Sequence, residues 1–166
     1  MLFSAADLRL ANDVIEGCRA VNARLVTAES CTGGLVTALL TEIAGASDVV
    51  DAGFVTYSNE AKIQQLGVDP GLLDTHGAVS EPTARAMAEG ALKAVRASTI
   101  ALSVTGVAGP GGGSMAKPVG TVHFAVAADR RPTLSHHQLF AGSRQSIRLD
   151  AMRFGLTLIG TAATQG

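Results

Sequence analysis

The chain turns from a strand into a helix at Thr27-Ala28-Glu29-Ser30-Cys31-Thr32-Gly33-Gly34. A short segment containing Leu25 and Val26 precedes this turn, and residues 35–44 follow it with apolar side chains at helical spacing. A strand that turns through small residues into a helix leaves free backbone N–H groups at the helix start. A hydroxyl and a thiol stand side by side in the turn, so it offers a nucleophile beside a site for negative charge.

Outward from this turn, helical and strand patterns alternate along the chain. The patterns predict helices over 4–23, 33–44, 61–66 and 81–97, and a last helix from Ser143. Strands are predicted over 24–28, within 49–57, and over 99–104, 120–127 and 133–140, while Pro70, Gly71 and Gly77 predict loop and turn. The last strand follows its predecessor too closely for a crossover, which predicts an antiparallel pair. We therefore expect one α/β domain over 1–166, a three-layer α/β/α sandwich with a mixed, mostly parallel central sheet.

The composition indicates a folded domain without a strong charge preference. Of the 166 residues, 47% are hydrophobic and 16% are charged, and the formal net charge is −1. This balance gives no reason to expect nucleic acid or an anionic membrane as a partner. The N-terminus lacks the pattern of a secretory signal, and Cys18 and Cys31 provide neither a metal-binding spacing nor a disulfide framework. We expect a cytoplasmic protein with no metal, in which Cys18 is a core residue.

Ser30 can be read in two ways. A serine before a glycine-rich helix start is commonly only a helix cap or a phosphate ligand, whereas a nucleophile needs a base. The chain's histidines lie in poor sequence contexts for that role: His76, His123, His136 and His137. Lys62 is the better candidate, because an apolar wall at the strand-to-helix junction 57–62 would lower its pKa and leave a neutral amine. The alternative is a surface pair of Lys62 with Glu60 or Asp69.

Cys31 is a rival nucleophile, because a helix N-terminus can lower the pKa of a thiol. Only one of two adjacent side chains can point into the same pocket. We favour Ser30, although the spacing does not decide between the two. The N–H groups of residues 31–34 could hold an oxyanion, and Glu29 could either face a cationic ligand or cap the helix.

A second glycine-rich loop spans Thr105 to Ser114. Its backbone could wrap a phosphate or sugar without side-chain clashes, or it could be a plain surface loop. Lys117 could add positive charge beside it. Arg144 could bind a phosphate through two hydrogen bonds, whereas Arg148 is expected on a solvated helix face.

Several separated motifs together resemble the C-terminal domain of the competence/damage-inducible protein family CinA, over about residues 5–160. The motifs are Thr27–Gly34, Tyr57–Lys62, Val79-Ser80-Glu81, Val104–Pro110 and Lys117–Val122. The resemblance implies hydrolysis of the carboxamide of nicotinamide mononucleotide to nicotinate mononucleotide and ammonia. It also implies a small-molecule nucleotide substrate, no cofactor, and a homo-oligomer, most simply a dimer.

The resemblance also implies roles for individual residues. Ser30 would be the nucleophile, with Lys62 and Tyr57 as its activating partners. The substrate-binding residues would come from the first turn, the second glycine-rich loop and the last helix: Glu29, Cys31, Thr32, Gly33, Gly34, Thr105, Gly106, Ala108, Gly109 and Arg144.

The chain departs from the family pattern at two positions, which are Ser143 where the family has an acidic residue and Ala116 before Lys117. These departures support one alternative, a non-catalytic nucleotide-binding or regulatory module. A further alternative is an amidase for a related carboxamide.

Overall fold

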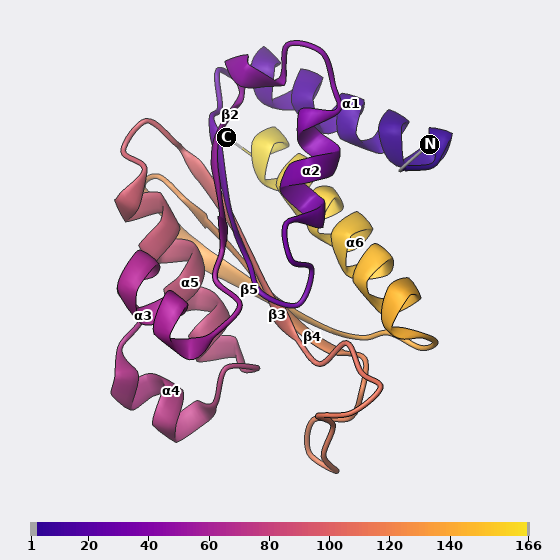
Figure 1. The fold of residues 1–166 in the computed structure, drawn as a ribbon. Helices are drawn as coiled ribbons and strands as arrows, with labels where there is room; N and C mark the ends of the chain where they lie inside the picture. Colours follow the sequence, from indigo (N-terminus) through magenta and orange to yellow (C-terminus); the bar gives the residue numbers. More distant parts are fainter. Residues whose placement is uncertain (1–2, 166) are drawn as a thin grey trace.

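The computed structural model of the chain describes residues 3–165 and shows one twisted sheet between two layers of helices (Figure 1). The strands are ordered β2-β1-β3-β4-β5 across the sheet. Their bounds are β1 Leu25–Glu29, β2 Val50–Val55, β3 Ile100–Gly106, β4 Thr121–Ala128 and β5 Arg131–Leu139. β1 pairs in parallel with β2 and β3, whereas β4 runs antiparallel to both β3 and β5.

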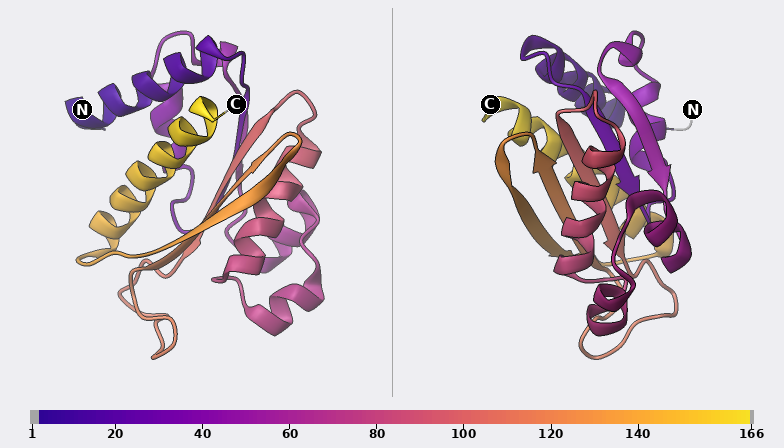
Figure 2. Two further views of the ribbon diagram at one scale, coloured as in Figure 1. Left: turned by 180° about the vertical axis from the view of Figure 1, so that it is seen from behind. Right: turned by 90° about the vertical axis from the view of Figure 1, so that its left-hand side faces the viewer.

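Helices cover both faces of the sheet: the left view of Figure 2 shows the three layers edge-on, and the right view looks onto the face that carries α5. One face is covered by α1 (Ala5–Ala20), α2 (Leu35–Thr41) and α6 (Arg144–Thr164), the other by α3 (Asn59–Leu66), α4 (Pro70–His76) and α5 (Glu81–Ala94). A short 3-10 helix, η1 (Ala46–Asp48), leads into β2. The expected three-layer α/β/α arrangement with a mixed sheet is confirmed. Antiparallel pairing extends to β3–β4, which the sequence patterns do not predict.

The core follows from the alternation of side chains along the central strands. On the α6 side, Leu102 and Phe124 pack into one apolar cluster with helix residues such as Ile147. On the α5 side, Ala101 and Met87 belong to a second cluster. All five residues of β1 are buried, as expected for a strand covered on both faces.

Local capping explains most helix starts, and it also explains one wrong prediction. Residues 70–76, predicted as loop and turn, form α4. The Asp69 side chain accepts a hydrogen bond from the backbone N–H of Leu72 at 2.9 Å, and Pro70 occupies the first turn. Proline at that position favours a helix start, because the missing N–H has no helical partner to lose. Leu73, 5% exposed, then anchors the helix in the core.

The topology brings three chain segments to one edge of the sheet. Glu29, the last residue of β1, lies opposite Val55 of β2 and Val104 of β3. The three strands run in the same direction, so the segments that leave their carboxyl ends emerge together. In open α/β sheets this edge is where ligands bind. The Ser30 turn, the Tyr57 junction and the Thr105 loop therefore meet there.

Candidate active site

The Ser30 turn is a tightly bonded reversal of the backbone. The N–H of Ser30 donates to the carbonyl of Val104 at 2.8 Å, and its carbonyl accepts from the N–H of Gly33 at 3.1 Å. Gly33 and Gly34 have φ angles of +61° and +94°, a region that glycine enters without a steric penalty. The two glycines let the chain turn sharply from β1 into α2, with Ser30 8% exposed at the bend.

Glu29 caps α2 from beneath the turn. Its carboxylate accepts hydrogen bonds from the backbone N–H groups of Gly34, Val36 and Thr37 and from the Thr37 hydroxyl, at 2.8–3.1 Å. The side chain is fully buried. A carboxylate there satisfies the unpaired N–H groups of the first turn. For Glu29, the structure therefore favours a role in capping α2 over contact with a ligand.

Lys62 reaches the Ser30 hydroxyl from α3. Its Nζ atom lies 2.9 Å from Ser30 Oγ, 2.8 Å from the carbonyl oxygen of Thr56 and 3.5 Å from that of Tyr57. The side chain is only 1% exposed. Burial lowers the pKa of Lys62 below its ordinary value of 10.5, because desolvation disfavours the charged ammonium. Lys62 makes no ion pair within residues 3–165, so the predicted alternative of a surface pair with Glu60 or Asp69 is wrong.

The thiol of Cys31 is not activated, contrary to the expectation for a helix N-terminus. Cys31 is 6% exposed, and burial raises the pKa of its thiol to about 11. Desolvation outweighs the favourable charges of Arg148 and Lys62. The thiol is therefore protonated near neutral pH. The geometry favours Ser30, which contacts the amine directly.

Tyr57 lies at the site, with its hydroxyl directed to Arg144 and not to Lys62. Its hydroxyl accepts a hydrogen bond from Arg144 at 2.9 Å, and the same guanidinium donates to the carbonyl of Gly109 at 2.7 Å. The Tyr57 residue is 61% exposed. Its backbone carbonyl, not its hydroxyl, faces Lys62. This arrangement favours a binding role for the tyrosine ring over a proton relay between Ser30 and Lys62.

The first half of the second glycine-rich loop forms a wall of the pocket. Thr105 donates from its hydroxyl to the carbonyl of Ala78 at 2.7 Å, which joins β3 to the segment before α5. A Cβ on Gly106 would lie 2.7 Å from the carbonyl oxygen of Thr121, so only glycine fits there without a shift. The N–H of Val107 donates to the same carbonyl at 2.8 Å. These bonds tie the loop to β4.

The two remaining basic candidates support the backbone. Lys117 donates from Nζ to the carbonyl of His76 at 2.8 Å. Arg148, expected on a solvated helix face, instead donates from Nε to the carbonyl of Cys31 at 3.0 Å and from Nη2 to that of Thr32 at 2.8 Å. The expectation for Arg148 is therefore wrong, because α6 packs against the turn that carries Ser30.

A pocket of about 230 Å³ contains the pair of Ser30 and Lys62. Most of its lining was predicted as site residues, and Ala78 and Val79 were missed although Val79 lies in one of the motifs quoted above. The lining residues are Ser30, Cys31, Tyr57, Lys62, Ala78, Val79, Thr105, Gly106, Ala108 and Arg144. Five predicted binding residues lie outside this lining: Glu29, Thr32, Gly33, Gly34 and Gly109.

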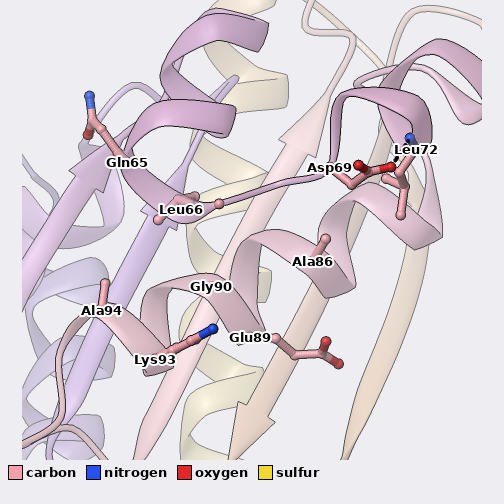
Figure 3. A pocket seen from close by; sticks show the side chains of 10 residues that line it. Gln65, Leu66, Asp69, Leu72, Ala86, Glu89, Gly90, Lys93 and Ala94 are labelled. Atoms are coloured by element: carbon pink, nitrogen blue, oxygen red, sulfur yellow. Dashed lines mark hydrogen bonds between the residues drawn. The ribbon is translucent and has the colours of Figure 1, made fainter.

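A larger hollow of about 580 Å³ lies between α5 and the segment that joins α3 to α4 (Figure 3). Its charged residues, Asp69, Glu89 and Lys93, are all exposed. No group of three or more metal-binding side chains occurs among residues 3–165, and no helix in that range is both long and apolar enough to cross a membrane.

Comparison with known proteins agrees with this architecture. The family model of the CinA C-terminal domain matches residues 7–163. The chain is 49% identical to the nicotinamide-nucleotide amidohydrolase PncC of Escherichia coli K12, over 90% of each chain. It is 50% identical to a CinA-like protein of Syntrophobacter fumaroxidans, covering 85% of this chain and 33% of that one.

Solved structures show the same fold. The competence/damage inducible protein CihA from Agrobacterium tumefaciens superposes with a TM-score of 0.94 at 47% identity, over 99% of both chains. A CinA superfamily protein from Escherichia coli gives 0.89 at 32% identity, over 97% of this chain and 94% of that one. The chain belongs to the CinA C-terminal domain family.

Proposed function

We propose that the chain is a nicotinamide-nucleotide amidohydrolase, which converts nicotinamide mononucleotide and water to nicotinate mononucleotide and ammonia. The amidohydrolase named among its relatives, similar over nearly its whole length, supports the substrate. The observation that carries the mechanism is the contact of 2.9 Å between a buried lysine amine and the Ser30 hydroxyl. Serine–lysine pairs are a known variant of the nucleophile–base arrangement.

The surroundings of Lys62 suit a neutral amine. A neutral amine has two N–H donors and one lone pair. The carbonyls of Thr56 and Tyr57 can accept the two N–H groups, which leaves the lone pair for the hydroxyl proton of Ser30. Since burial lowers the pKa of Lys62, this neutral form becomes accessible at lower pH than for a lysine in water. Lys62 can therefore act as the general base.

The oxyanion needs a backbone donor next to Ser30, and the turn leaves one that is not bonded to another residue within 3–165. The N–H groups of Gly33 and Gly34 are already bonded to Ser30 and Glu29, and Thr32 is fully buried. The N–H of Cys31 has no acceptor on another residue within 3–165, and Cys31 lines the pocket. The N–H of the residue after the nucleophile has this role in other hydrolases, where such a donor contributes about 3 kcal/mol.

The reaction then proceeds in two stages. Lys62 takes the proton of Ser30 as the serine oxygen bonds to the amide carbon, and the negative charge on the carbonyl oxygen is held by the N–H of Cys31. The Lys62 ammonium protonates the departing nitrogen, the C–N bond breaks, and ammonia leaves. Neutral Lys62 next takes a proton from water as the water oxygen attacks the ester carbon. The Lys62 ammonium returns this proton to Ser30 Oγ as the C–O bond breaks, and the acid product loses its own proton to solvent and leaves as the carboxylate. Arg144 lines the pocket as a cation available to the phosphate.

The departures from the family pattern do not favour the non-catalytic alternative. Ser143 still caps α6, since its side chain accepts from the N–H of Ser146 at 3.2 Å. Ala116 is exposed. Neither residue lines the pocket.

Ammonia release from nicotinamide mononucleotide tests the proposal directly. We expect turnover by the wild type, loss of at least about 1,000-fold in kcat for Ser30→Ala, and retained turnover for Cys31→Ala. A panel with nicotinamide and nicotinamide riboside separates the nucleotide from related carboxamides. Active Ser30→Ala with inactive Cys31→Ala would overturn the assignment, and wild-type binding without ammonia would favour the regulatory module.

A further inference from the structure

We propose that Arg148 is a positioning residue that orients and polarises the Cys31 N–H toward the oxyanion. The proposal rests on the proposed function, since it assigns a role in that reaction. Arg148 does not line the pocket. It acts through the backbone of the turn, by a chain of hydrogen bonds that passes through two peptide units.

The guanidinium of Arg148 is bound to two successive carbonyls of the turn. Nε donates to the carbonyl of Cys31 at 3.0 Å, and Nη2 donates to that of Thr32 at 2.8 Å. The planar fork of an arginine can hold two acceptors in a fixed relation, which a lysine cannot do. The contact joins α6 to the nucleophile turn across 116 residues of sequence.

The peptide planes carry this contact to the nucleophile. In a trans peptide, the C=O and the following N–H are held rigidly and point in opposite directions. Fixing the carbonyl of Thr32 therefore fixes the N–H of Gly33, which donates to the carbonyl of Ser30 at 3.1 Å. Fixing the carbonyl of Ser30 in turn fixes the N–H of Cys31, the donor that has no acceptor on another residue within 3–165.

The same chain also makes that donor stronger. Each hydrogen bond polarises the next when several are linked head to tail, and the effect grows where the surroundings exclude water. Here the chain begins at a permanent cation, Arg148, and ends at the N–H of Cys31. Because every donor in this chain points toward the Cys31 end, the chain increases the positive partial charge on the hydrogen of the Cys31 N–H. This hydrogen is the one that meets the developing negative charge.

Gly33 provides independent evidence that the turn accommodates the guanidinium of Arg148. A Cβ at Gly33 would lie 3.2 Å from Nη2 of Arg148, and the φ angle of +61° already disfavours other residues. The absence of a side chain lets the guanidinium reach the carbonyl of Thr32. Glu29 holds the next N–H, that of Gly34, from inside the molecule at 3.0 Å. The turn is thus clamped from both sides.

The test compares Arg148→Ala and Arg148→Lys with Arg153→Ala. Arg153 lies on the same helix, but its side-chain hydrogen bonds go to Asp7 and Asp150 and not to the turn. For Arg148→Ala we expect kcat to fall about 10- to 100-fold with KM within about threefold, because a misaimed oxyanion donor affects the transition state. Arg148→Lys keeps the positive charge but loses the planar fork, so its kcat should lie between those of the wild type and Arg148→Ala. Arg153→Ala should keep the kcat of the wild type.

Amide hydrogen exchange, measured by NMR without substrate, separates positioning from the chemistry. Exchange at the Gly33 N–H should accelerate at least about tenfold in Arg148→Ala, because its bond to Ser30 loosens. An unchanged kcat, an unchanged Gly33 exchange rate, full activity of Arg148→Lys, or an equal kcat loss in Arg153→Ala would each overturn the proposal. If Arg148→Ala does not fold, Arg148→Lys decides by the same readouts. A wild type that releases no ammonia would overturn the proposed function. The exchange data would still show whether Arg148 holds the turn in place.

Discussion

The Nζ atom of Lys62 lies 2.9 Å from Oγ of Ser30, although the lysine side chain is only 1% exposed. Burying an amine is unfavourable when it carries a proton and has no carboxylate beside it. Here the amine is surrounded by a hydroxyl and two backbone carbonyls. An environment that disfavours the charged form suits the proton-accepting role proposed for Lys62.

Replacing Lys62 by methionine should separate activity from stability. Methionine fills similar space without the amine, so we expect kcat to fall at least about 1,000-fold. The free energy of unfolding should stay within about 1 kcal/mol of the wild type, because the loss of a hydrogen bond to Thr56 is offset by removal of a buried polar group. Ammonia assays and urea denaturation measure the two effects. The exposed Lys93→Met is the control, and retained turnover in Lys62→Met would contradict the role of the amine.

The rate should rise with pH through the lowered pKa of Lys62. Protonated Lys62 cannot accept the proton of Ser30, so activity is lost on the acid side of that pKa, which lies below 10.5. The lowered pKa of Lys62 also makes the stability of the fold depend on pH. The folded state binds this proton more weakly than the unfolded chain, so stability increases as pH rises from the folded pKa to 10.5. A profile of kcat/KM against pH measures the first effect, and a rate that does not increase with pH below 10.5 would contradict it.

The parts of the molecule that were predictable are those that neighbouring residues determine. The helix starts predicted at residue 81 and at Ser143 were correct to within one residue, and Ser80 and Ser143 cap the two helices. The local pattern also identified Lys62 at a strand-to-helix junction. α4 was missed because Pro70 was read as a breaker, whereas Asp69 before it makes proline a favourable first-turn residue.

Contacts between distant segments were not predictable in the same way. Ser30 and Lys62 are 32 residues apart, and they meet only because β1 and β2 are adjacent and parallel. Arg148 is 117 residues from Cys31, and nothing in its own neighbourhood indicates that α6 packs against the turn. The thiol pKa of Cys31 was predicted in the wrong direction, because the helix start is visible in the sequence and the depth of burial is not.

Tyr57→Phe should affect substrate binding more than the chemical step. The hydroxyl of Tyr57 contacts Arg144, while Ser30 is bonded to Lys62. We expect KM for nicotinamide mononucleotide to rise about three- to tenfold and kcat to change less than about threefold. Steady-state kinetics with the nucleotide measure both constants. A loss of kcat as large as that of Lys62→Met would restore the relay role for Tyr57.

Glu29→Gln should destabilise the protein through α2. The carboxylate accepts hydrogen bonds from three backbone N–H groups and one hydroxyl, and it is fully buried. A glutamine offers one acceptor oxygen and places an NH2 group against the remaining donors. We expect a loss of about 2–3 kcal/mol in unfolding free energy. Urea denaturation measures it, with the exposed Glu42→Gln as the control. Full stability with weakened substrate binding would instead favour the ligand role.

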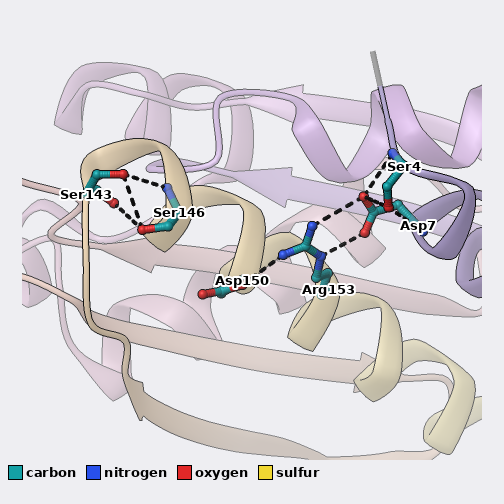
Figure 4. A network of polar contacts seen from close by, with 6 residues as sticks. All are labelled: Ser4, Asp7, Ser143, Ser146, Asp150 and Arg153. Carbon is teal, nitrogen blue, oxygen red and sulfur yellow. Dashed lines mark hydrogen bonds and ion pairs between the residues drawn. The ribbon is translucent and has the colours of Figure 1, made fainter. Parts of the chain in front are cut away.

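The ion pair between Asp7 and Arg153, which joins α1 to α6, should give an acid-dependent part of the stability (Figure 4). Arg153 donates from Nε at 2.7 Å and from Nη2 at 3.3 Å to the Asp7 carboxylate, whose side chain is 5% exposed. These bonds, opposed by desolvation and assisted by Ser4, lower the pKa of Asp7 from 3.8 to about 2.

Because the folded pKa is the lower one, the contribution of Asp7 is complete above 3.8 and disappears as the pH falls toward 2. It amounts to roughly 2 kcal/mol. Asp7→Asn should therefore lower the unfolding free energy by about that amount at neutral pH and by almost nothing near pH 2. Asp150→Asn is the matched control, since Asp150 is a half-exposed partner of the same arginine three residues away, worth about 0.5 kcal/mol. Urea titrations across this pH range measure both variants. A deficit in Asp7→Asn that persists unchanged at the acid end would mean that packing, and not charge, holds α1 to α6.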